Sequence, residues 1–517
     1  MSVAAGRCAD DRIPYAGPMT ARSLMIAGTT SDAGKSVVTT GLCRLLARRG
    51  VKVAPFKAQN MSNNSMVVTG PEGEGAEIGR AQWIQAVAAG AVPETAMNPV
   101  LLKPGGDRRS HVVVRGRPAG TLDAREYAGG RRTLAEAAFA AYDELAARFD
   151  VVVCEGAGSP TEINLRDGDY VNMGLARYAS MPVVVVGDID RGGVYAALHG
   201  TVALLSPADQ ALVCGFVLNK FRGDESLLAP ANEAIERVTG RPVLGVVPWS
   251  PHVWLDSEDG LDLAGRRAAS ADPLRVVVVR LPRISNFTDV DALGLEPGVD
   301  VTFASDPRRV SEADLVVVPG TRATLSDLAW MRGRGLDAAV VAHARAGRPV
   351  LGICGGFQIL GRMISDPDGV EGPAGTRADG LGLLDVTTTF GTDKVLRLST
   401  GSALGAEASG YEIHHGRVTR GDDEEFLGGA RRTNVLGTMW HGTLESDGLR
   451  RSLLAEVATA VGRAWEPGTV SFADARTARL DLLADLLDAH VDVDALLALI
   501  HGGAPVDLPR VPPAGIG

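Results

Sequence analysis

The stretch SLMIAGTTSDAGKS, residues 23–36, decides the first half of the fold. An apolar run leads into a loop that carries glycine, a Lys-Ser pair follows, and residues 37–50 then place apolar side chains on one helical face. Strand, glycine loop, Gly-Lys-Ser and helix are the order that a phosphate-binding loop requires. The spacing between Gly28 and Gly34 is one residue longer than in the common motif.

This stretch predicts a nucleotide site. Backbone N–H groups from Thr30 to Gly34 and the start of the helix would surround phosphates, because both present unpaired donors. Lys35 would reach the β and γ oxygens, and Ser36 would ligate Mg²⁺. The alternative is a tight strand-to-helix turn, and the Lys-Ser pair in this context argues against it.

Short β-branched runs alternate with helical patterns through the chain, which predicts parallel sheets covered on both faces. The expected strands are SLMIAG, VKVAPFK, FDVVVCEG, MPVVVVGDID, ALVCGFVLNK and PVLGVVPW in the first half, and LRVVVVRL, ADLVVVPG, RPVLGIC and VLGTMWHG in the second. The fold class expected is α/β, with two parallel-sheet domains in sequence.

Polar residues at the ends of the first set of strands extend the nucleotide site, because open α/β sheets bind ligands at that edge. Glu155 would complete the Mg²⁺ shell. Asp188 and its neighbour Asp190 are further candidate ligands, with a helix-capping role as the equal alternative. Asn219 would hydrogen-bond a nucleotide base. The amide-rich loop 56–65 is either a recognition loop or a hydrophilic surface loop.

A second site is predicted at LGICGGFQILG, residues 351–361. Glycines around Cys354 permit a sharp strand-to-helix turn like the G-x-S-x-G nucleophile elbow, with sulfur in place of oxygen. The helix start favours the thiolate. The N–H of Gly355 would serve an oxyanion hole, with Gly320 as the source of the second donor. Cys43, Cys154 and Cys214 fit the role of buried hydrophobic residues instead.

The cysteine needs a histidine base. His441 is favoured because it follows a predicted strand end, whereas His343 is expected on a helix surface and the 411–415 stretch is a weaker candidate. A third group that orients the imidazole would be Glu445 or Asp447.

Composition limits the function classes. The net charge of −10 over 517 residues argues against a general nucleic-acid binder. Five scattered cysteines without a CxxC pair are typical of a reducing cytoplasm. No apolar run reaches the ~18 residues of a membrane span, and the first residues have no apolar signal segment. We therefore expect a cytoplasmic protein with no membrane partner.

Eight motifs in order resemble the cobyric acid synthases, a glutamine amidotransferase family of the cobalamin pathway. They are GTTSDAGKS, PFKAQNMSNNS, EGAGSPTEINLRDGDYVNMGLAR, GDIDRGGV, NKFRGD, SNFTDVDAL, GICGGFQILG and GYEIHHG. The resemblance implies a dethiobiotin-synthetase-like first domain and a class I, triad-type glutaminase second domain. It implies that four carboxylates of adenosylcobyrinic acid a,c-diamide are amidated with ATP and L-glutamine. Magnesium would accompany ATP, with no tightly bound organic cofactor.

In that class Cys354 is the nucleophile, His441 is the base and Gln358 contacts substrate glutamine. Class I enzymes usually carry Glu two residues after the histidine, and here that position is Thr443. The resemblance therefore implies a dyad or a differently placed acid.

The expected organisation has five segments. They are an extension at 1–22 (with Met19 as a candidate start), an ATP-dependent amidoligase domain at 23–250, a linker at 251–272, a glutamine amidotransferase domain at 273–460, and a helical segment with a tail at 461–517. Two other functions stay open. One is the related cobyrinic acid a,c-diamide synthase, and the other is a P-loop switch ATPase whose glutaminase-like domain only binds.

Overall fold

The computed structural model describes residues 22–104, 109–123, 127–166, 168–250 and 272–512. Residues 1–21 of the predicted extension and nearly all of the predicted linker lie outside the described residues, whereas Arg22, predicted as the end of the extension, begins β1. None of the described helices is both long and apolar enough to cross a membrane.

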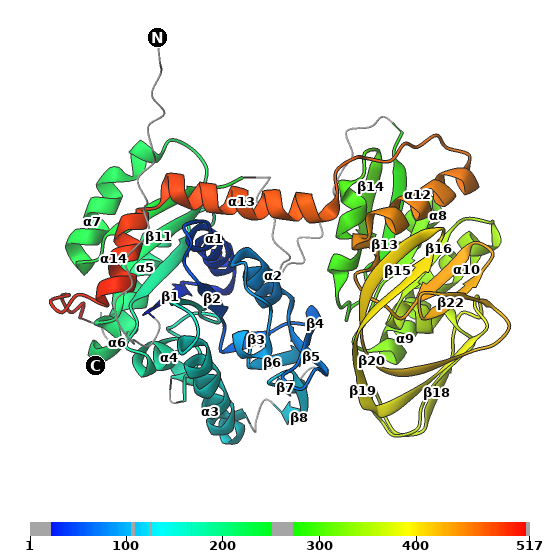
Figure 1. The fold of residues 1–517 in the computed structure, drawn as a ribbon, viewed down its shortest axis with the longest axis horizontal. Helices are drawn as coiled ribbons and strands as arrows, with labels where there is room; N and C mark the ends of the chain where they lie inside the picture. Colours follow the sequence, from blue (N-terminus) through cyan, green and yellow to red (C-terminus); the bar gives the residue numbers. More distant parts are fainter. Residues whose placement is uncertain (1–21, 105–108, 124–126, 167, 251–271, 513–517) are drawn as a thin grey trace, which may run out of the picture.

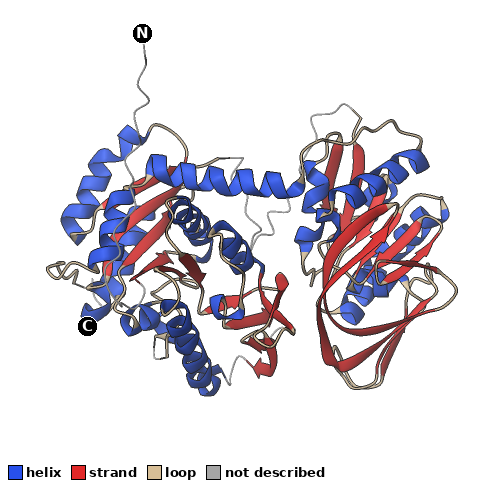
Figure 2. Cartoon of the chain, viewed as in Figure 1, coloured by secondary structure: helices blue, strands red, loops and turns tan. Residues whose placement is uncertain are grey.

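The first half is built on a six-stranded parallel sheet (Figures 1 and 2). Its strands, in spatial order, are β12 (Val243–Pro248), β11 (Val213–Phe221), β10 (Val183–Asp188), β1 (Arg22–Gly28), β9 (Val151–Glu155) and β2 (Val53–Phe56). All six expected runs form these strands, so the expected fold class is confirmed here.

Alternate residues of these strands enter two separate cores, because successive side chains of a strand point to opposite faces. Met25 and Ala27 of β1 join one cluster, and Leu24 and Ile26 join the other. Helices cover both faces: α1 (Lys35–Arg48), α2 (Arg80–Ala88), α3 (Tyr127–Ala146), α4 (Met173–Tyr178), α5 (Val194–Leu204) and α7 (Ala229–Thr239). Two covered faces explain the continuous apolar runs in the sequence.

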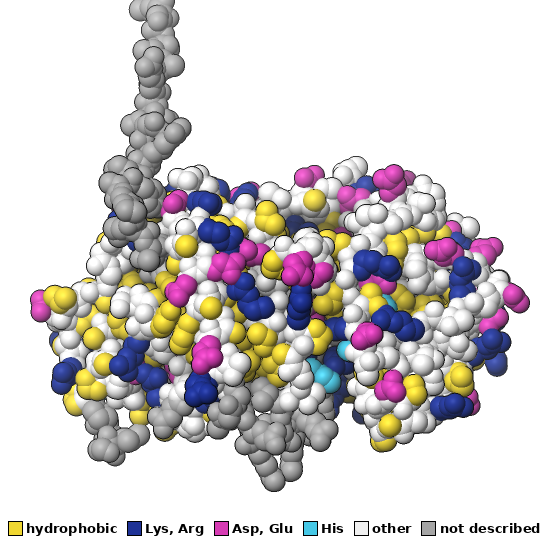
Figure 3. All heavy atoms as spheres, turned by 60° about the horizontal axis from the view of Figure 1, so that its bottom comes forward, with side chains coloured by type: hydrophobic (Ala, Val, Ile, Leu, Met, Phe, Trp, Pro, Cys, Tyr) yellow, Lys and Arg dark blue, Asp and Glu magenta, His cyan; other side chains and the backbone are white. Residues whose placement is uncertain are grey.

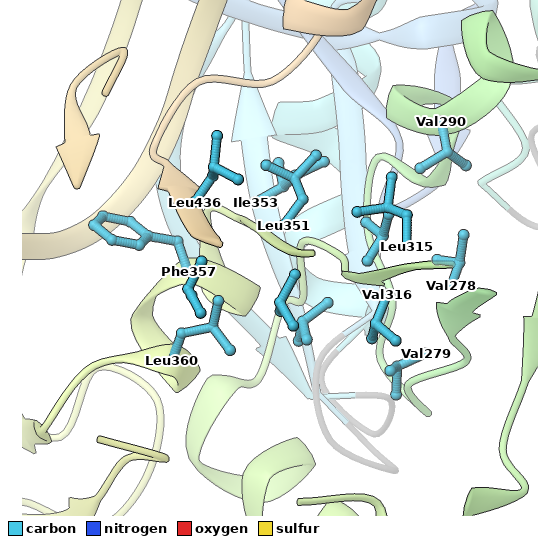
Figure 4. Packing of buried hydrophobic residues seen from close by; sticks show 14 of the residues in the cluster. Val278, Val279, Val290, Leu315, Val316, Leu351, Ile353, Phe357, Leu360 and Leu436 are labelled. Atoms are coloured by element: carbon cyan, nitrogen blue, oxygen red, sulfur yellow. The ribbon is translucent and has the colours of Figure 1, made fainter. Parts of the chain in front are cut away.

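The second half is built on a seven-stranded sheet in which five strands pair in parallel, and β22 and β21 are added at one edge through two antiparallel pairs. Its order is β14 (Val299–Ala304), β13 (Leu274–Val279), β15 (Leu315–Val318), β16 (Val350–Ile353), β23 (Val435–Thr438), β22 (Gly429–Arg432) and β21 (Glu424–Phe426). Its helices are α8 (Pro307–Ser311), α9 (Thr324–Arg334), α10 (Leu336–Arg345), α11 (Gly355–Leu360) and α12 (Asp447–Val461). Figure 4 shows part of its core, to which Val316 and Leu351 of neighbouring strands contribute together with Phe357 of α11.

The C-terminal segment returns to the first half. Helix α13 (Phe472–His490) spans the two halves in Figure 1, and α14 (Val493–Gly502) follows it. Leu483 and Leu487 of α13 pack with Leu42 of α1 in one core cluster. The first half is thus completed by residues that come last in the chain.

Three smaller sheets lie outside the predicted runs. They are β3 (Gln59–Met61) with β6 (Val100–Pro104), β7 (Arg109–Val114) and β8 (Arg117–Asp123); β4 (Ser65–Thr69) with β5 (Gly75–Gly79); and β18 (Thr376–Asp379) with β17 (Met363–Asp366), β19 (Val386–Ala403) and β20 (Ala406–Arg420). The β4–β5 hairpin meets the long β19–β20 hairpin, where Met66 and Val67 pack on Tyr411 and Ile413. The two halves therefore share a buried junction.

The amide-rich loop 56–65 is mostly buried. Asn60 is 1% exposed, and its amide donates to Gln82 of α2 at 2.9 Å. Ser62 and Asn64 are also buried. The interpretation as a hydrophilic surface loop is wrong, because most of the loop is buried inside the protein.

Candidate functional site

The predicted phosphate-binding loop lies between β1 and α1. Gly34 has φ +98°, a conformation that L side chains rarely adopt. A Cβ there would lie 1.9 Å from the Asn219 amide nitrogen, so only glycine fits. Helix α1 begins at the next residue, which directs its free N–H groups into the loop.

Lys35 is folded into the loop. Its ammonium donates to the carbonyls of Thr30 at 2.9 Å, Ser31 at 3.1 Å and Gly158 at 3.1 Å. Gly158 belongs to the loop that follows β9, so the charge lies between two strand ends. Thr30 and Lys35 thus meet where the sequence placed them.

Ser36 and Glu155 meet at the same edge. The Ser36 hydroxyl donates to one Glu155 oxygen at 2.9 Å, and Lys57 pairs with that oxygen at 3.0 Å. Gln85 of α2 donates to the other oxygen at 2.5 Å. Burial alone would raise the pKa of Glu155, but the charges of Lys57 and Lys35 hold it below its ordinary value.

This donor set fits Mg²⁺, which prefers a carboxylate, a hydroxyl and phosphate oxygens. Asp188 lies elsewhere in the same edge: it accepts from Lys220 at 2.8 Å and from the N–H of Asp190. Asn219 donates to the carbonyl of Ala33 at 3.0 Å. The structure therefore gives Asn219 a contact that supports the loop, and its expected contact with a base stays a prediction.

Cys354 occupies a strained turn between β16 and α11. Its φ is +49°, which costs a non-glycine residue about 1–3 kcal/mol. The turn is enforced from both sides: the Cys354 N–H donates to Thr438 at 2.7 Å, and a Cβ at Gly356 would lie 1.9 Å from the Val318 carbonyl oxygen. The elbow geometry is the one that the glycine pattern predicts.

The predicted glycines surround the cysteine. A Cβ on Gly320 would lie 2.8 Å from His441 Cε1, and a Cβ on Gly355 would lie 2.7 Å from Thr321 Cγ2. Side chains at either position would fill the space beside the thiol. Gln358 is buried on α11, one turn beyond the cysteine, and it accepts a 3.4 Å hydrogen bond from Thr324.

His441 is the histidine beside the thiol, and Cys354 contributes to the electrostatics of its ring. Its Nδ1 lies 2.6 Å from Asp289 Oδ2, and both side chains are buried. Burial would lower the pKa of His441, but the charges of Asp289 and Cys354 raise it to about 10. This arrangement favours an imidazolium beside Cys354.

The predicted third group was wrong. Asp289 orients the imidazole, from the 3₁₀ segment Phe287–Leu295 far upstream in the chain. Glu445 pairs with Arg80 and Arg476 at 2.6 Å each, and Asp447 pairs with Arg450. Asp289 stands in SNFTDVDAL, a motif noted in the sequence but given no role, because no spacing rule links it to a histidine 152 residues later.

The other histidines lie away from the thiol. His343 is buried rather than on a helix surface, and its Nε2 lies 3.1 Å from the Pro349 carbonyl. His414 contacts Glu412, and His415 contacts the Gly391 carbonyl. Tyr411 does join the site, because its ring stacks on the His441 ring with centroids 5.5 Å apart.

The two sites are connected through α2 and the β4–β5 hairpin. Arg80 begins α2 and pairs with Glu445 in the second half, whereas Gln85 of the same helix contacts Glu155 in the nucleotide site. The Ser65 N–H donates to Asn286 at 3.1 Å, and Asn286 in turn donates to the Tyr411 hydroxyl at 3.2 Å. No sequence pattern predicts these contacts, since they exist only once the halves meet.

Comparisons with known proteins agree with this division. The family described as CobQ/CobB/MinD/ParA nucleotide binding domain matches residues 24–263, and the CobB/CobQ-like glutamine amidotransferase domain matches residues 275–449. The cobyric acid synthase of Mycolicibacterium gilvum is 68% identical over 95% of this chain and 99% of its own. That of Mycobacterium tuberculosis is 66% identical, again over 95% of this chain and 99% of its own. A solved glutamine amidotransferase matches 36% of this chain and 98% of its own at 20% identity, with a TM-score of 0.27.

Proposed function

Since the chain belongs to the cobyric acid synthase family, we propose that it amidates the b, d, e and g carboxylates of adenosylcobyrinic acid a,c-diamide, using ATP and glutamine. The chain is a glutamine-hydrolysing carbon–nitrogen ligase. The observation that carries the finer proposal is the pair of sites on one chain: a thiol beside His441 and Asp289, and a phosphate loop beside Glu155.

The glutaminase half supplies ammonia. The Cys354 thiolate attacks the glutamine amide carbon, while the N–H groups at Gly320 and Gly355 hold the developing oxyanion. His441, held as a cation by Asp289, gives its proton to the departing nitrogen, so that ammonia leaves and a thioester remains. His441 then takes a proton from water, which hydrolyses the thioester to glutamate and restores the thiolate.

The nucleotide half activates the substrate. A carboxylate is a poor electrophile, so a substrate carboxylate oxygen attacks the γ-phosphorus and ADP leaves with the bridging oxygen. Ammonia then attacks the acyl phosphate carbon, phosphate departs, and the amide remains. Lys35 and the loop N–H groups orient the phosphates and offset their charge. Mg²⁺, when bound by Ser36 and Glu155, would neutralise further phosphate charge.

The division of labour follows the segments proposed from the sequence. We assign the ligase chemistry to residues 23–250, the connection to 251–272 and the glutaminase chemistry to 273–460. The segment 461–517 supports the ligase half, since α13 packs on α1. Ammonia is mostly protonated near neutral pH, and the buried junction of β4–β5 with β19–β20 supports a sheltered passage between the sites.

Isotope transfer tests the acyl phosphate. Adenosylcobyrinic acid a,c-diamide carrying ¹⁸O in its free carboxylates should deliver one ¹⁸O to inorganic phosphate for each amide formed. Phosphate without label would refute carboxyl activation by ATP. Passage of ammonia is tested with ¹⁵N-glutamine in unlabelled ammonium, where full dilution of the label would rule out a sheltered route.

The two alternative functions predict different results. A cobyrinic acid a,c-diamide synthase would amidate cobyrinic acid and leave the a,c-diamide unchanged. A switch ATPase with a binding-only second domain would hydrolyse no glutamine. The oriented pair of Cys354 and His441 favours catalysis over binding alone.

A further inference from the structure

A buried ionic network crosses the junction between the two halves. The Glu77 carboxylate of β5 pairs with Lys103 of β6 at 2.5 Å and with Lys394 of β19. Ser65 donates to the same Glu77 oxygen that Lys103 contacts, at 2.7 Å. The Glu77 side chain is fully buried, and those of Lys103 and Lys394 are only 5% and 10% exposed.

Three further basic side chains face this network. His111 is the cross-strand partner of Lys103 in the β6–β7 pair. His415 of β20 contacts the Gly391 carbonyl, in the irregular part of β19 that carries Lys394. Arg322 follows β15 and lies close enough for its charge to lower the pKa values of both histidines. We call Lys103, His111, Arg322, Lys394 and His415 the junction cluster; basic and histidine side chains are visible where the halves meet in Figure 3.

The junction cluster carries more positive than negative charge. Burial lowers the pKa of His111 to about 3 and of His415 to about 4, with the neighbouring cations adding to the effect, so both rings are neutral at pH 7. Lys103, Lys394 and Arg322 then face two carboxylates, Glu77 and Glu371. Burial raises the pKa of Glu371 to about 7, so its negative charge is only partial at pH 7.

The positive charge of Arg322 is the least compensated of the three. Among the described residues no hydrogen bond or ion pair engages its guanidinium, although Glu371 and Glu77 attract it at longer range. Burial lowers the pKa of Arg322. Lys103 is buried, and Lys394 and Arg322 are partly buried, so an excess of their positive charge is costly unless an anion is held among them.

The location of the junction cluster fits an anionic substrate that must reach both sites. Strand β6 pairs with β3, which begins two residues after Lys57 at the phosphate site. On the other side, the Ile413 carbonyl of β20 lies 4.0 Å from the Cys354 sulfur. The strands that carry the junction cluster therefore adjoin both the predicted phosphate site and Cys354.

We propose that the junction cluster binds the unreacted carboxylates of the corrinoid substrate while another carboxylate stands at the γ-phosphate. This inference rests on the proposed function and adds the residues that recognise the polyacid. Lys103 and His111 come from one half, and Arg322, Lys394 and His415 come from the other. The binding surface is consequently complete only when the halves are joined.

The proposal predicts affinity that falls as the reaction proceeds. Each amidation removes one negative charge, so the fully amidated product has four fewer charges for the junction cluster to attract. The enzyme would hold the early intermediates more tightly than the late ones, and it would release the product without a separate conformational step.

Binding and turnover of Arg322→Gln test the proposal. This variant has the simplest interpretation, because Arg322 forms no ion pair among the described residues and its loss leaves no carboxylate without a partner. With ammonium as the nitrogen source, the KM for the a,c-diamide should rise by about 10–100-fold. Equilibrium binding of the amidated product should change little. Lys394→Gln should act in the same direction, and Lys394→Arg should restore most of the affinity.

Two controls separate corrinoid binding by Arg322 from a general effect of charge and from glutamine binding. Arg377→Gln removes an exposed cation of β18, in the four-stranded sheet that also contains Lys394 and His415. It should leave the KM for the a,c-diamide and the affinity for the amidated product unchanged. Glutamine hydrolysis by Arg322→Gln should keep its KM for glutamine. A rise in that KM without a change for the corrinoid would assign Arg322 to the glutamine carboxylate and overturn the proposal.

The possible outcomes distinguish a failure of this inference from a failure of the proposed function. Wild-type enzyme that amidates no corrinoid acid would refute the proposed function, and this inference with it. Wild-type enzyme that amidates the a,c-diamide, beside an Arg322→Gln variant that binds substrate and product as the wild type does, would refute this inference alone.

Discussion

Replacement of Asp289 by asparagine is the sharpest test of the glutaminase site. The side chain keeps its size, and its remaining oxygen can still accept the Gly442 N–H that Asp289 Oδ1 accepts at 2.8 Å. The negative charge 2.6 Å from His441 Nδ1 is lost, and an amide N–H₂ can face the ring instead. The expected result is an imidazole of lower pKa in the wrong tautomer.

The size of the effect follows from the geometry. Two unit charges about 4 Å apart interact by ~4 kcal/mol at an effective dielectric constant of about 20, which corresponds to about three pKa units. The pKa of His441, about 10 in the wild type, should fall toward about 7. The same change in a serine-protease triad lowers kcat by about 10⁴-fold, so we expect a loss of about 10³–10⁴-fold here.

The assay is the pH profile of glutamine hydrolysis. The alkaline limb should lie near pH 10 in the wild type and move down by about three units in Asp289→Asn. Ammonium-dependent amidation should be unchanged, and the exposed Asp422→Asn serves as the control. A variant with wild-type kcat and an unshifted alkaline limb would refute the assignment of Asp289.

Stability gives a second readout of the same pair. The pKa of His441 in the folded protein is raised above its ordinary 6.5. The stabilisation that the His441–Asp289 pair adds to the folded state is therefore fully present below pH 6.5 and is lost as pH rises through about 10. The difference in unfolding free energy between wild type and Asp289→Asn should therefore narrow across that interval.

Three further substitutions test the nucleotide half and its junction. Glu445→Gln leaves the buried Arg80 and the partly buried Arg476 without their carboxylate, and should cost about 3–5 kcal/mol in denaturant unfolding. The half-exposed Glu456→Gln should cost less than about 1 kcal/mol, and equal costs would contradict the junction geometry. Lys35→Met should lower amidation by at least about 10²-fold with either nitrogen source while glutamine hydrolysis persists, and normal amidation would remove Lys35 from the phosphate site. Gly41→Ala should destabilise the protein although alanine has the better helix propensity, because its Cβ would lie 2.7 Å from Leu487 Cδ1. Gly200→Ala, where the Cβ would meet open space, should stabilise the protein by about 0.5–1 kcal/mol. A Gly41→Ala protein that is more stable than the wild type would contradict the packing of α13 on α1.

The fold was largely predictable because the decisive elements are local. Continuous apolar runs such as VVVV at 183–186 identify buried parallel strands without any knowledge of their neighbours. The strained turn at Cys354 was predictable for the same reason, since the glycines that permit it stand within two residues. The small sheets were not predictable, because strands such as Gln59–Met61 carry polar side chains that are buried only by partners from elsewhere.

The missed site residues share one property: distance along the chain. Asp289 reaches His441 only after its 3₁₀ segment packs beside the 3₁₀ turn Thr443–Glu445. A carboxylate four residues from the histidine was the nearest guess from spacing. Glu445 instead serves the junction, because Arg80 of the other half comes within 2.6 Å of it. Contacts of this kind depend on how two halves meet, and periodicity does not encode that.

The central claim is that one chain releases ammonia at Cys354 and consumes it at the phosphate loop. The most direct measurement compares wild type with Cys354→Ala on adenosylcobyrinic acid a,c-diamide and ATP, following amide formation with ¹⁵N from labelled glutamine or labelled ammonium. We predict four successive ¹⁵N incorporations by the wild type from either source, and by the variant from ammonium alone. Glutamine-dependent amidation by Cys354→Ala, or failure of ammonium to support a folded variant that binds ATP, would contradict the account.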